Sequence, residues 1–247
     1  MQPPHAEVRF RQTLSRPATH RPLLAGLAAA LLTWVFIQIS SEMVEGETRT
    51  FDMAILRAAQ SLRIGHPWVS EVMRDLSGLG STTVLTLFTV VAVGYLAVVR
   101  ARLTALLVVA AVITGSVGVS LLKVQFGRPR PDASFAELVA PGMSFPSGHA
   151  TISAIVFLTV AALLASTRTR AIERTYILAM AALMALLVGL SRIALGVHWA
   201  TDVAAGWAFG AAWALAWLLL ARRLSRTHAG NLVERRPRRA MANISTR

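Results

Sequence analysis

Six long apolar runs constrain the fold of this chain more than any other feature of its sequence. About 20 consecutive apolar residues span a bilayer as a helix, and a helix satisfies its own backbone hydrogen bonds there. Hydrophobic residues make up 55% of the 247 residues and charged residues only 15%, unlike an ordinary soluble domain. The sequence therefore predicts an all-α polytopic membrane protein with six transmembrane helices, at about 23–39, 82–99, 103–122, 149–166, 174–191 and 202–221.

The first run is short for a membrane span, and a cleaved signal peptide is the alternative interpretation. The long basic lead before it and the lack of a small-residue cleavage site favour an uncleaved first helix. In the polar connection 40–81, apolar residues recur at helical spacing from Phe51 and again from Trp68. We expect two short amphipathic helices there, which either cap the bundle or border a lipid entrance; capping is the simpler role.

Basic residues dominate the charge, with 25 Lys and Arg against 12 Asp and Glu and a formal net charge of +13. Most of them lie in the tails and in the turns 100–102 and 168–174, which fits the positive-inside rule better than nucleic-acid binding. Both termini are then cytoplasmic. We expect disordered basic tails at 1–22 and 222–247, the second able to contact anionic lipid, around a membrane domain at 23–221.

Three polar blocks interrupt the apolar sequence, and the helix count places all of them on the extracytoplasmic side. The first contains Lys123, Arg128-Pro129 and Arg130-Pro131. A residue before proline disfavours helix, so the chain turns out of its span here while carrying cations across the mouth of the bundle. Guanidinium and ammonium groups bind phosphate oxygens, although a basic membrane flank would explain this block alone.

The second block is Pro146-Ser147-Gly148-His149, directly before the fourth run. Ser147 suits the N-cap of that helix, and Gly148 allows close approach to the backbone. The first turn of a helix presents free N–H groups to an anion, and His149 in that turn can exchange protons with a phosphate ester. A helix cap with an incidental histidine explains this block equally well.

The third block contains Ser191-Arg192, His198 and Asp202. His198 and Asp202 are four residues apart, on one helical face, so the carboxylate can orient the imidazole and stabilise its cation. A structural salt bridge would explain this pair alone. Together, however, the three blocks place cations, a helix start and two histidines on one side of a membrane, and that combination needs an anionic ligand. Phosphate fits best.

No cysteine is present, which excludes disulfides, thiolate nucleophiles and zinc–cysteine sites.

The three blocks closely resemble the three-part signature of the type 2 phosphatidic acid phosphatase and vanadium haloperoxidase superfamily. Lys123 is followed after six residues by Arg130-Pro131, and Pro146-Ser147-Gly148-His149 comes next. Ser191-Arg192 is then followed after five residues by His198 and after three more by Asp202. The resemblance covers roughly residues 50–221 and points to the membrane branch, because six apolar spans have no place in a soluble haloperoxidase.

The resemblance implies a role for each signature residue. His198 would attack phosphorus and form a phosphohistidine, Asp202 would hold its ring, and His149 would protonate the leaving oxygen and then activate water. The phosphoryl oxygens would be bound by Lys123, Arg130, Ser147, the Gly148 backbone N–H and Arg192. Arg128 lies outside the signature and receives only local charge as a role. No metal and no cofactor are expected.

The implied activity is hydrolysis of the terminal phosphate of a membrane lipid. Undecaprenyl diphosphate, phosphatidylglycerol phosphate and phosphatidic acid are candidate substrates, with a slight preference for the polyprenyl diphosphate from the outward-facing site. A phosphotransferase that passes phosphate to another lipid or sugar is the alternative, and a non-catalytic transporter of the same fold is a third reading. Intact His149, His198 and Asp202 disfavour the transporter. The expected partners are the lipid substrate and membrane lipids, and the sequence leaves the oligomeric state open.

Overall fold

The computed structural model describes residues 20–242, with side chains for residues 22–224. Within these residues the chain is all-helical, and six segments are long and apolar enough to cross a membrane, which confirms the predicted polytopic fold. The elements are α2 (His20–Glu45), α3 (Arg49–Gly65), α4 (Trp68–Gly78), α5 (Thr82–Val98), α6 (Arg102–Phe126), the 3-10 turn η1 (Ala133–Phe135), α7 (Gly148–Ser166), α8 (Ala171–Ala194) and α9 (Ala200–Ala242). One of the six segments joins α4 to α5.

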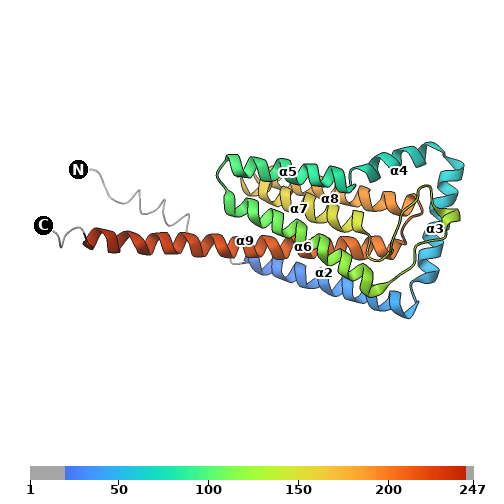
Figure 1. Cartoon of the computed structure of the whole chain (residues 1–247), viewed down its shortest axis with the longest axis horizontal. Coiled ribbons are helices and arrows are strands. Elements are labelled where there is room, and N and C mark those ends of the chain that lie inside the picture. Colours follow the sequence, from blue (N-terminus) through green and yellow to red (C-terminus); the bar gives the residue numbers. More distant parts are fainter. Residues whose placement is uncertain (1–19, 243–247) are drawn as a thin grey trace.

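The helices α7 and α9 lie at the centre of the bundle (Figure 1). α7 packs against both α8 and α9, α9 also packs along α2, and α5 and α6 pack against α7 from another side. Glycine lets α7 and α9 approach closely, because a Cβ at Gly210 would come 2.6 Å from the carbonyl oxygen of Thr151. This close crossing brings the starts of the two helices together, where the Ser147 N–H donates to the Asp202 carbonyl oxygen at 3.0 Å.

Both short helices expected between residues 40 and 81 are present, and α3 lies across one end of the bundle (Figure 1). The orientation of α3 is the reverse of an ordinary packed amphipathic helix. Its buried residues are Asp52, Leu56 and Arg63, whereas Phe51 and Leu62 of its apolar stripe are 56% and 51% exposed. Asp52 and Arg63 face the bundle together with Leu56, while most of the apolar stripe faces outward, as in a helix that lies on a membrane surface.

Two buried charged residues hold α3 on the bundle. Asp52 accepts hydrogen bonds from the backbone N–H and the hydroxyl of Thr201, at 3.0 and 2.7 Å. Arg63, eleven residues later, donates to the carbonyl oxygens of Ala194 and Phe135. Because these partners belong to α9, α8 and the loop between α6 and α7, α3 ties three separate segments together, which fits the capping role.

Three helices continue beyond the ends that hydropathy suggested. α2 runs to Glu45, and α6 runs to Phe126, where Gly127 adopts a left-handed conformation with φ 57° and ends it. α9 continues to Ala242, so residues 222–242, which we expected to be disordered, are helical. This Arg-rich stretch continues a helix that the membrane span has already nucleated. The expected tails at 1–19 and 243–247 lie outside the described residues.

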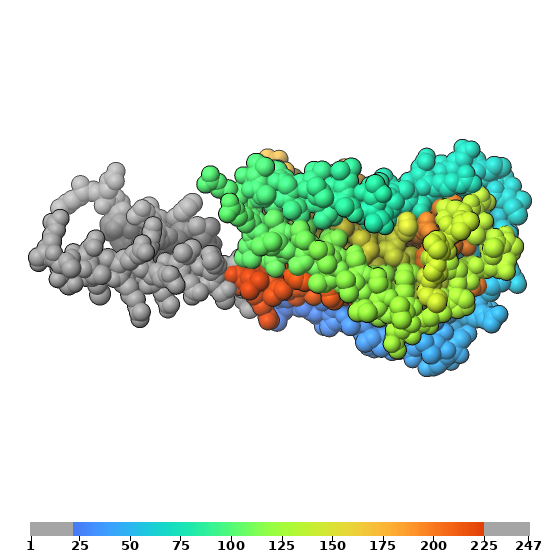
Figure 2. All heavy atoms as spheres, in the orientation of Figure 1, coloured from blue at the N-terminus to red at the C-terminus, as the bar shows by residue number. Residues whose placement is uncertain are grey.

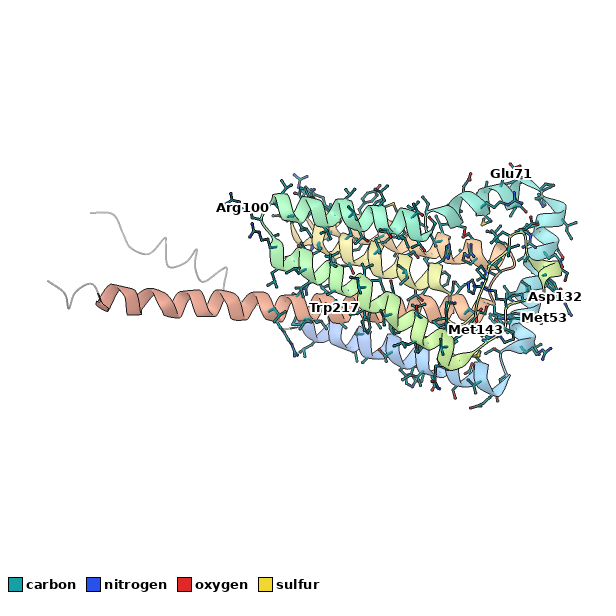
Figure 3. The ribbon with its side chains drawn as sticks, in the orientation of Figure 1. Met53, Glu71, Arg100, Asp132, Met143 and Trp217 are labelled. Atoms are coloured by element: carbon teal, nitrogen blue, oxygen red, sulfur yellow. The ribbon has the colours of Figure 1, made fainter. Side chains whose placement is uncertain are left out.

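The two ends of the bundle differ in the residues they carry. Arg100, in the turn between α5 and α6, lies at one end, together with the turn between α7 and α8 that contains Arg168 and Arg170 (Figures 1 and 3). Asp132 and Met143 lie at the opposite end, beside α3 (Figure 3). We call these the Arg100 end and the α3 end.

Candidate active site

The three polar blocks of the sequence meet at the α3 end. The loop 127–147 leaves α6, crosses this end as part of its surface, and enters α7 (Figure 2). Phe145 anchors the loop just before Ser147, because its side chain is fully buried with ring centroids 6.0 Å from Phe36 and 4.9 Å from Phe126. The third block lies at the end of α8 and the start of α9, directly beside the start of α7.

His198 and Asp202 form a buried pair, with 2% and 0% of their surfaces exposed. The Nδ1 atom of His198 lies 3.3 Å from Oδ2 of Asp202. The prediction that the pair shares a helical face is wrong, because His198 lies in the turn before α9 and only Asp202 lies in the helix. Asp202 Oδ2 also accepts the Trp199 N–H at 3.0 Å, which folds this turn towards the carboxylate.

The contacts of His198 define which of its nitrogens is reactive. The Asp202 carboxylate assigns the ring proton to Nδ1, which leaves a lone pair on Nε2. Nε2 lies 3.1 Å from Nη1 of Arg130. Burial lowers the pKa of His198 to about 4, against the hydrogen bond and charge of Asp202, which raise it. At neutral pH the ring is therefore neutral, with its lone pair directed towards cations.

Three cations of the site have no carboxylate partner: within the described residues, Lys123, Arg130 and Arg192 take part in no ion pair. The charges of Lys123 and Arg130 act on His198, and that of Arg192 acts on His149. Lys123 Nζ donates to the Met143 carbonyl oxygen at 2.6 Å, Arg192 Nη1 donates to Ser77 Oγ at 2.5 Å, and Arg130 donates to three backbone carbonyl oxygens. In the same part of the chain, no three His, Asp or Glu side chains are grouped to hold a metal ion. Uncompensated cations around a neutral imidazole form a site for an anion.

Two buried polar atoms at this site lack a hydrogen-bond partner among the described residues: Oγ of Ser147 and Nε of Arg192. Ser147 is the N-cap residue of α7, as predicted, but its side chain makes no capping bond. An unpaired buried polar group costs about 1–3 kcal/mol. Both atoms can therefore be satisfied by a ligand that accepts hydrogen bonds, and an oxyanion does so.

Gly148 and His149 complete the site in the first turn of α7. A Cβ at Gly148 would lie 3.9 Å from Cε of Lys123, so the backbone here stays open towards that cation. His149 is half-buried and makes no hydrogen bond with other described residues. It lies within reach of the charges of Arg192, Arg130 and Lys123 and of His198 itself. The structure thus brings all eight predicted site residues together.

Three further residues at the site were not anticipated as functional: Asp52, Arg128 and Ser144. Arg128, to which we assigned only local charge, donates to Asp52 Oδ2 and to Asp202 Oδ1, each at 2.6 Å. Ser144 Oγ donates to Asp202 and lies 3.3 Å from Nδ1 of His198. A carboxylate beside the apolar stripe of a short helix was the signal available for Asp52, while Ser144 has no signal beyond loop polarity.

Known proteins resemble this chain in sequence and in fold. The family model of the PAP2 superfamily matches residues 103–226 of the chain, which include every signature residue named above. The chain is similar to phosphatidylglycerophosphatase B of Bacillus subtilis (strain 168), with 32% identity over 179 residues that cover 71% of this chain and 85% of the relative.

Two solved structures are similar to the fold. The crystal structure of a transmembrane PAP2-type phosphatidylglycerolphosphate phosphatase from Bacillus subtilis has a TM-score of 0.72 and 27% identity, and the match covers 81% of this chain and 96% of that one. Aquifex aeolicus LpxE has a TM-score of 0.52 and 27% identity, with 67% and 93% covered. Since sequence, fold and family model agree, this chain belongs to the PAP2 superfamily, as a multi-pass membrane phosphatase that acts on lipid phosphates.

Proposed function

We propose that the chain removes the terminal phosphate of a membrane lipid by two successive displacements at phosphorus. In the first, Nε2 of His198 attacks phosphorus, the bond to the lipid oxygen breaks, and a phosphohistidine forms. The observation that carries this proposal is the position of the His198 ring between a carboxylate at Nδ1 and a cation at Nε2. Asp202 keeps Nε2 unprotonated and stabilises the positive charge that the ring acquires in the attack.

His149 is the proposed acid and base of the reaction. In the first displacement its imidazolium donates a proton to the departing oxygen, which leaves as the alcohol of a monoester or as the lipid monophosphate of a diphosphate. In the second, neutral His149 accepts a proton from water as the water oxygen attacks phosphorus and the P–N bond to His198 breaks. Inorganic phosphate leaves and both histidines return to their starting states. The absence of a competing hydrogen bond from His149 among the described residues supports this role, because the ring is free to meet both oxygens.

Binding of the phosphoryl oxygens is assigned to the uncompensated cations and the two unpaired polar atoms. The positive charges of Lys123, Arg130 and Arg192 stabilise the negative charge of the phosphoryl oxygens in the transition state. A guanidinium group can bind two of these oxygens at once. Ser147 Oγ and the Gly148 N–H add hydrogen bonds at the positive end of α7. Because side-chain cations provide this charge, the proposed reaction is independent of metal ions.

The difference between the two ends of the bundle supports one membrane orientation. Arg100, Arg102, Arg168, Arg170 and Arg174 belong to the Arg100 end, and α9 also enters its Arg-rich stretch there. The positive-inside rule puts this end and both termini in the cytoplasm. The active site at the α3 end is then extracytoplasmic, where it meets lipids of the outer leaflet.

Phosphatidylglycerophosphate is the first candidate substrate, because the 32% identical relative is named for that activity. Undecaprenyl diphosphate is the second, favoured by the proposed extracytoplasmic site. Both present a terminal phosphate on a lipid anchor, which the cations bind in the same way. Phosphatidic acid has the same group without further polar substituents and serves as the minimal substrate.

The test is phosphate release from these three lipids by the detergent-purified protein, with a chelator present. We expect wild type to release phosphate and His198→Ala to release none, while Arg74→Gln, which removes a half-exposed ion pair with Glu137 at the same end, stays active. Rapid quenching of wild type with ³²P-labelled substrate should trap an acid-labile, alkali-stable phosphoprotein. Release without His198, or a strict need for added metal, would contradict the proposal; transfer of the label to an added lipid or sugar instead of water would identify a phosphotransferase.

A further inference from the structure

Arg128 is a mostly buried cation that bridges two buried carboxylates. Its Nη2 donates to Asp52 Oδ2 and its Nη1 donates to Asp202 Oδ1, both at 2.6 Å. Nη1 also reaches Thr201 Oγ1 at 2.8 Å, and the Trp199 ring covers the guanidinium with its centroid 5.4 Å from Cζ. This bridge fixes both the position and the orientation of the guanidinium, since its planar, rigid donors each bind a different carboxylate.

Through this bridge, both oxygens of Asp202 are occupied from opposite sides. Oδ1 accepts from Arg128, while Oδ2 accepts from Ser144 and the Trp199 N–H and faces His198 Nδ1. A carboxylate held by one oxygen can rotate about its Cβ–Cγ bond, whereas one held by both cannot. Arg128 therefore determines how Asp202 presents Oδ2 to the histidine.

The charges along this chain of contacts alternate. Asp52 and Asp202 each carry one negative charge and Arg128 carries one positive charge, so the three together present a net single negative charge to His198. Without Asp52, Arg128 would neutralise Asp202 at short range in a poorly solvated position, where Coulomb interactions are strong. A histidine that must become positively charged during attack on phosphorus would then lose the stabilisation that Asp202 supplies.

We propose that Asp52 and Arg128 are positioning residues for the reaction: they orient Asp202 and preserve its net charge, and so act on His198 from α3 through the loop after α6. The proposal rests on the proposed function for its catalytic readout. Neither residue touches the reacting atoms. Figure 3 shows Met53, the neighbour of Asp52 in α3, and Asp132 of the loop at the same end of the bundle.

Other charged groups also face His198, and the test must hold them constant. Arg130 from the loop, Lys123 from α6 and His149 from α7 act on its ring together with Asp202 from α9. None of these is changed in the variants below. The comparison therefore varies only the charge behind Asp202.

The experiment is a double-mutant cycle with Asp52→Asn and Arg128→Gln, measured as kcat and KM on the lipid that wild type turns over. The net charge behind His198 changes from −1 to 0 in the first variant, to −2 in the second, and back to −1 in the double variant. We expect each single change to lower kcat about tenfold or more with KM nearly constant, and the double variant to retain at least about tenfold more kcat than the product of the single losses. Independent structural damage would instead give the full product.

A second cycle provides the matched control. Arg63 is a buried cation of α3. It binds Ala194, Phe135 and Glu137 and does not contact Asp202. It lies eleven residues from Asp52, about 16 Å along the helix. The losses in Asp52→Asn and Arg63→Gln should therefore multiply, because well-separated sites act independently.

A readout independent of turnover is the ionisation of His198, followed through the ¹⁵N shifts of its imidazole. We expect Asp52→Asn to shift the midpoint of this titration to lower pH, Arg128→Gln to shift it to higher pH, and the double variant to return towards wild type. If no lipid is hydrolysed but these shifts occur, the proposed function fails and the positioning role stands. Multiplicative kcat losses in the first cycle, or an unchanged His198 titration in all variants, would overturn the positioning role.

Discussion

Replacing Ser147 by alanine should raise stability and lower activity, because its hydroxyl is buried without a protein partner. Oγ of Ser147 is fully enclosed and accepts or donates no hydrogen bond among the described residues. Loss of an N-cap side chain usually costs about 1 kcal/mol, but that cost does not apply here, since this side chain makes no capping bond. Removing the hydroxyl instead relieves part of a desolvation penalty of about 1–3 kcal/mol.

The effect on catalysis has the opposite sign. If Ser147 Oγ donates to a charged phosphoryl oxygen, its loss removes a hydrogen bond worth about 1.5–3 kcal/mol. At about 1.4 kcal/mol for each factor of ten, kcat/KM should fall roughly 10- to 100-fold. The variant should therefore be at least as stable as wild type in detergent while it hydrolyses lipid phosphate far more slowly.

Ser153 offers a matched control on the same helix. Its side chain is equally buried, but its Oγ donates to the Ala150 carbonyl oxygen at 3.2 Å. We expect Ser153→Ala to change the unfolding free energy by at most about 1 kcal/mol and to leave kcat/KM unchanged. Thermal unfolding and initial rates of phosphate release, measured on the same preparations, check both variants. If Ser147→Ala destabilises the protein, or keeps full activity, the hydroxyl does not bind the phosphoryl group as reasoned.

Three further outcomes are expected. The pH profile of kcat should be bell-shaped. On the acid side activity should be lost near pH 4, because the pKa of His198 is lowered to about 4. On the alkaline side it should be lost when His149, whose imidazolium a bound phosphate dianion stabilises, releases its proton. An acid limb near pH 6.5 would contradict the burial of His198. His198→Ala should abolish turnover, whereas Asp202→Asn should keep a measurable remnant with its acid limb at lower pH; equal rates would contradict the assignment. Gly196→Ala should disrupt the site, since its Cβ would meet the Phe135 carbonyl oxygen at 1.9 Å and φ is 71°, whereas Gly127→Ala, with φ 57° and free space, should cost only about 1–2 kcal/mol; equal activity and melting temperature in these two variants would refute the steric argument.

Hydropathy predicted the number of spans correctly because lipid exposure imposes long apolar runs, but it misplaced several helix ends. It measures the length in contact with hydrocarbon, not the length of the helix. α2 therefore continues through the polar stretch that ends at Glu45. In that stretch Ser40 Oγ donates to the Phe36 carbonyl oxygen, so its hydroxyl finds a hydrogen-bond partner within the helix. The same limit applies to α3, whose apolar stripe was recognised although its direction, away from the bundle, was not.

The signature residues could be identified because their chemistry is encoded in short local spacings. The contact between Arg128 and Asp52 joins residues 76 positions apart, and no local pattern encodes it. Fold geometry alone brings α3 onto the start of α9 and the loop. Arg128 was accordingly read as surplus charge, although its burial between two carboxylates makes it one of the most constrained cations in the described part of the chain.

The ties made by α3 and α4 have a consequence for exchanging parts between relatives. The family model begins at residue 103, yet Asp52, Arg63 and Ser77, which hold Arg128, the loop and Arg192, all precede it. A chimera that joins the first hundred residues of one relative to the matched region of another would keep every signature residue and still mismatch their supports. We therefore expect active recombinants to be those whose two halves carry Asp52 and Arg128 together, since either residue alone would leave a buried charge unpaired.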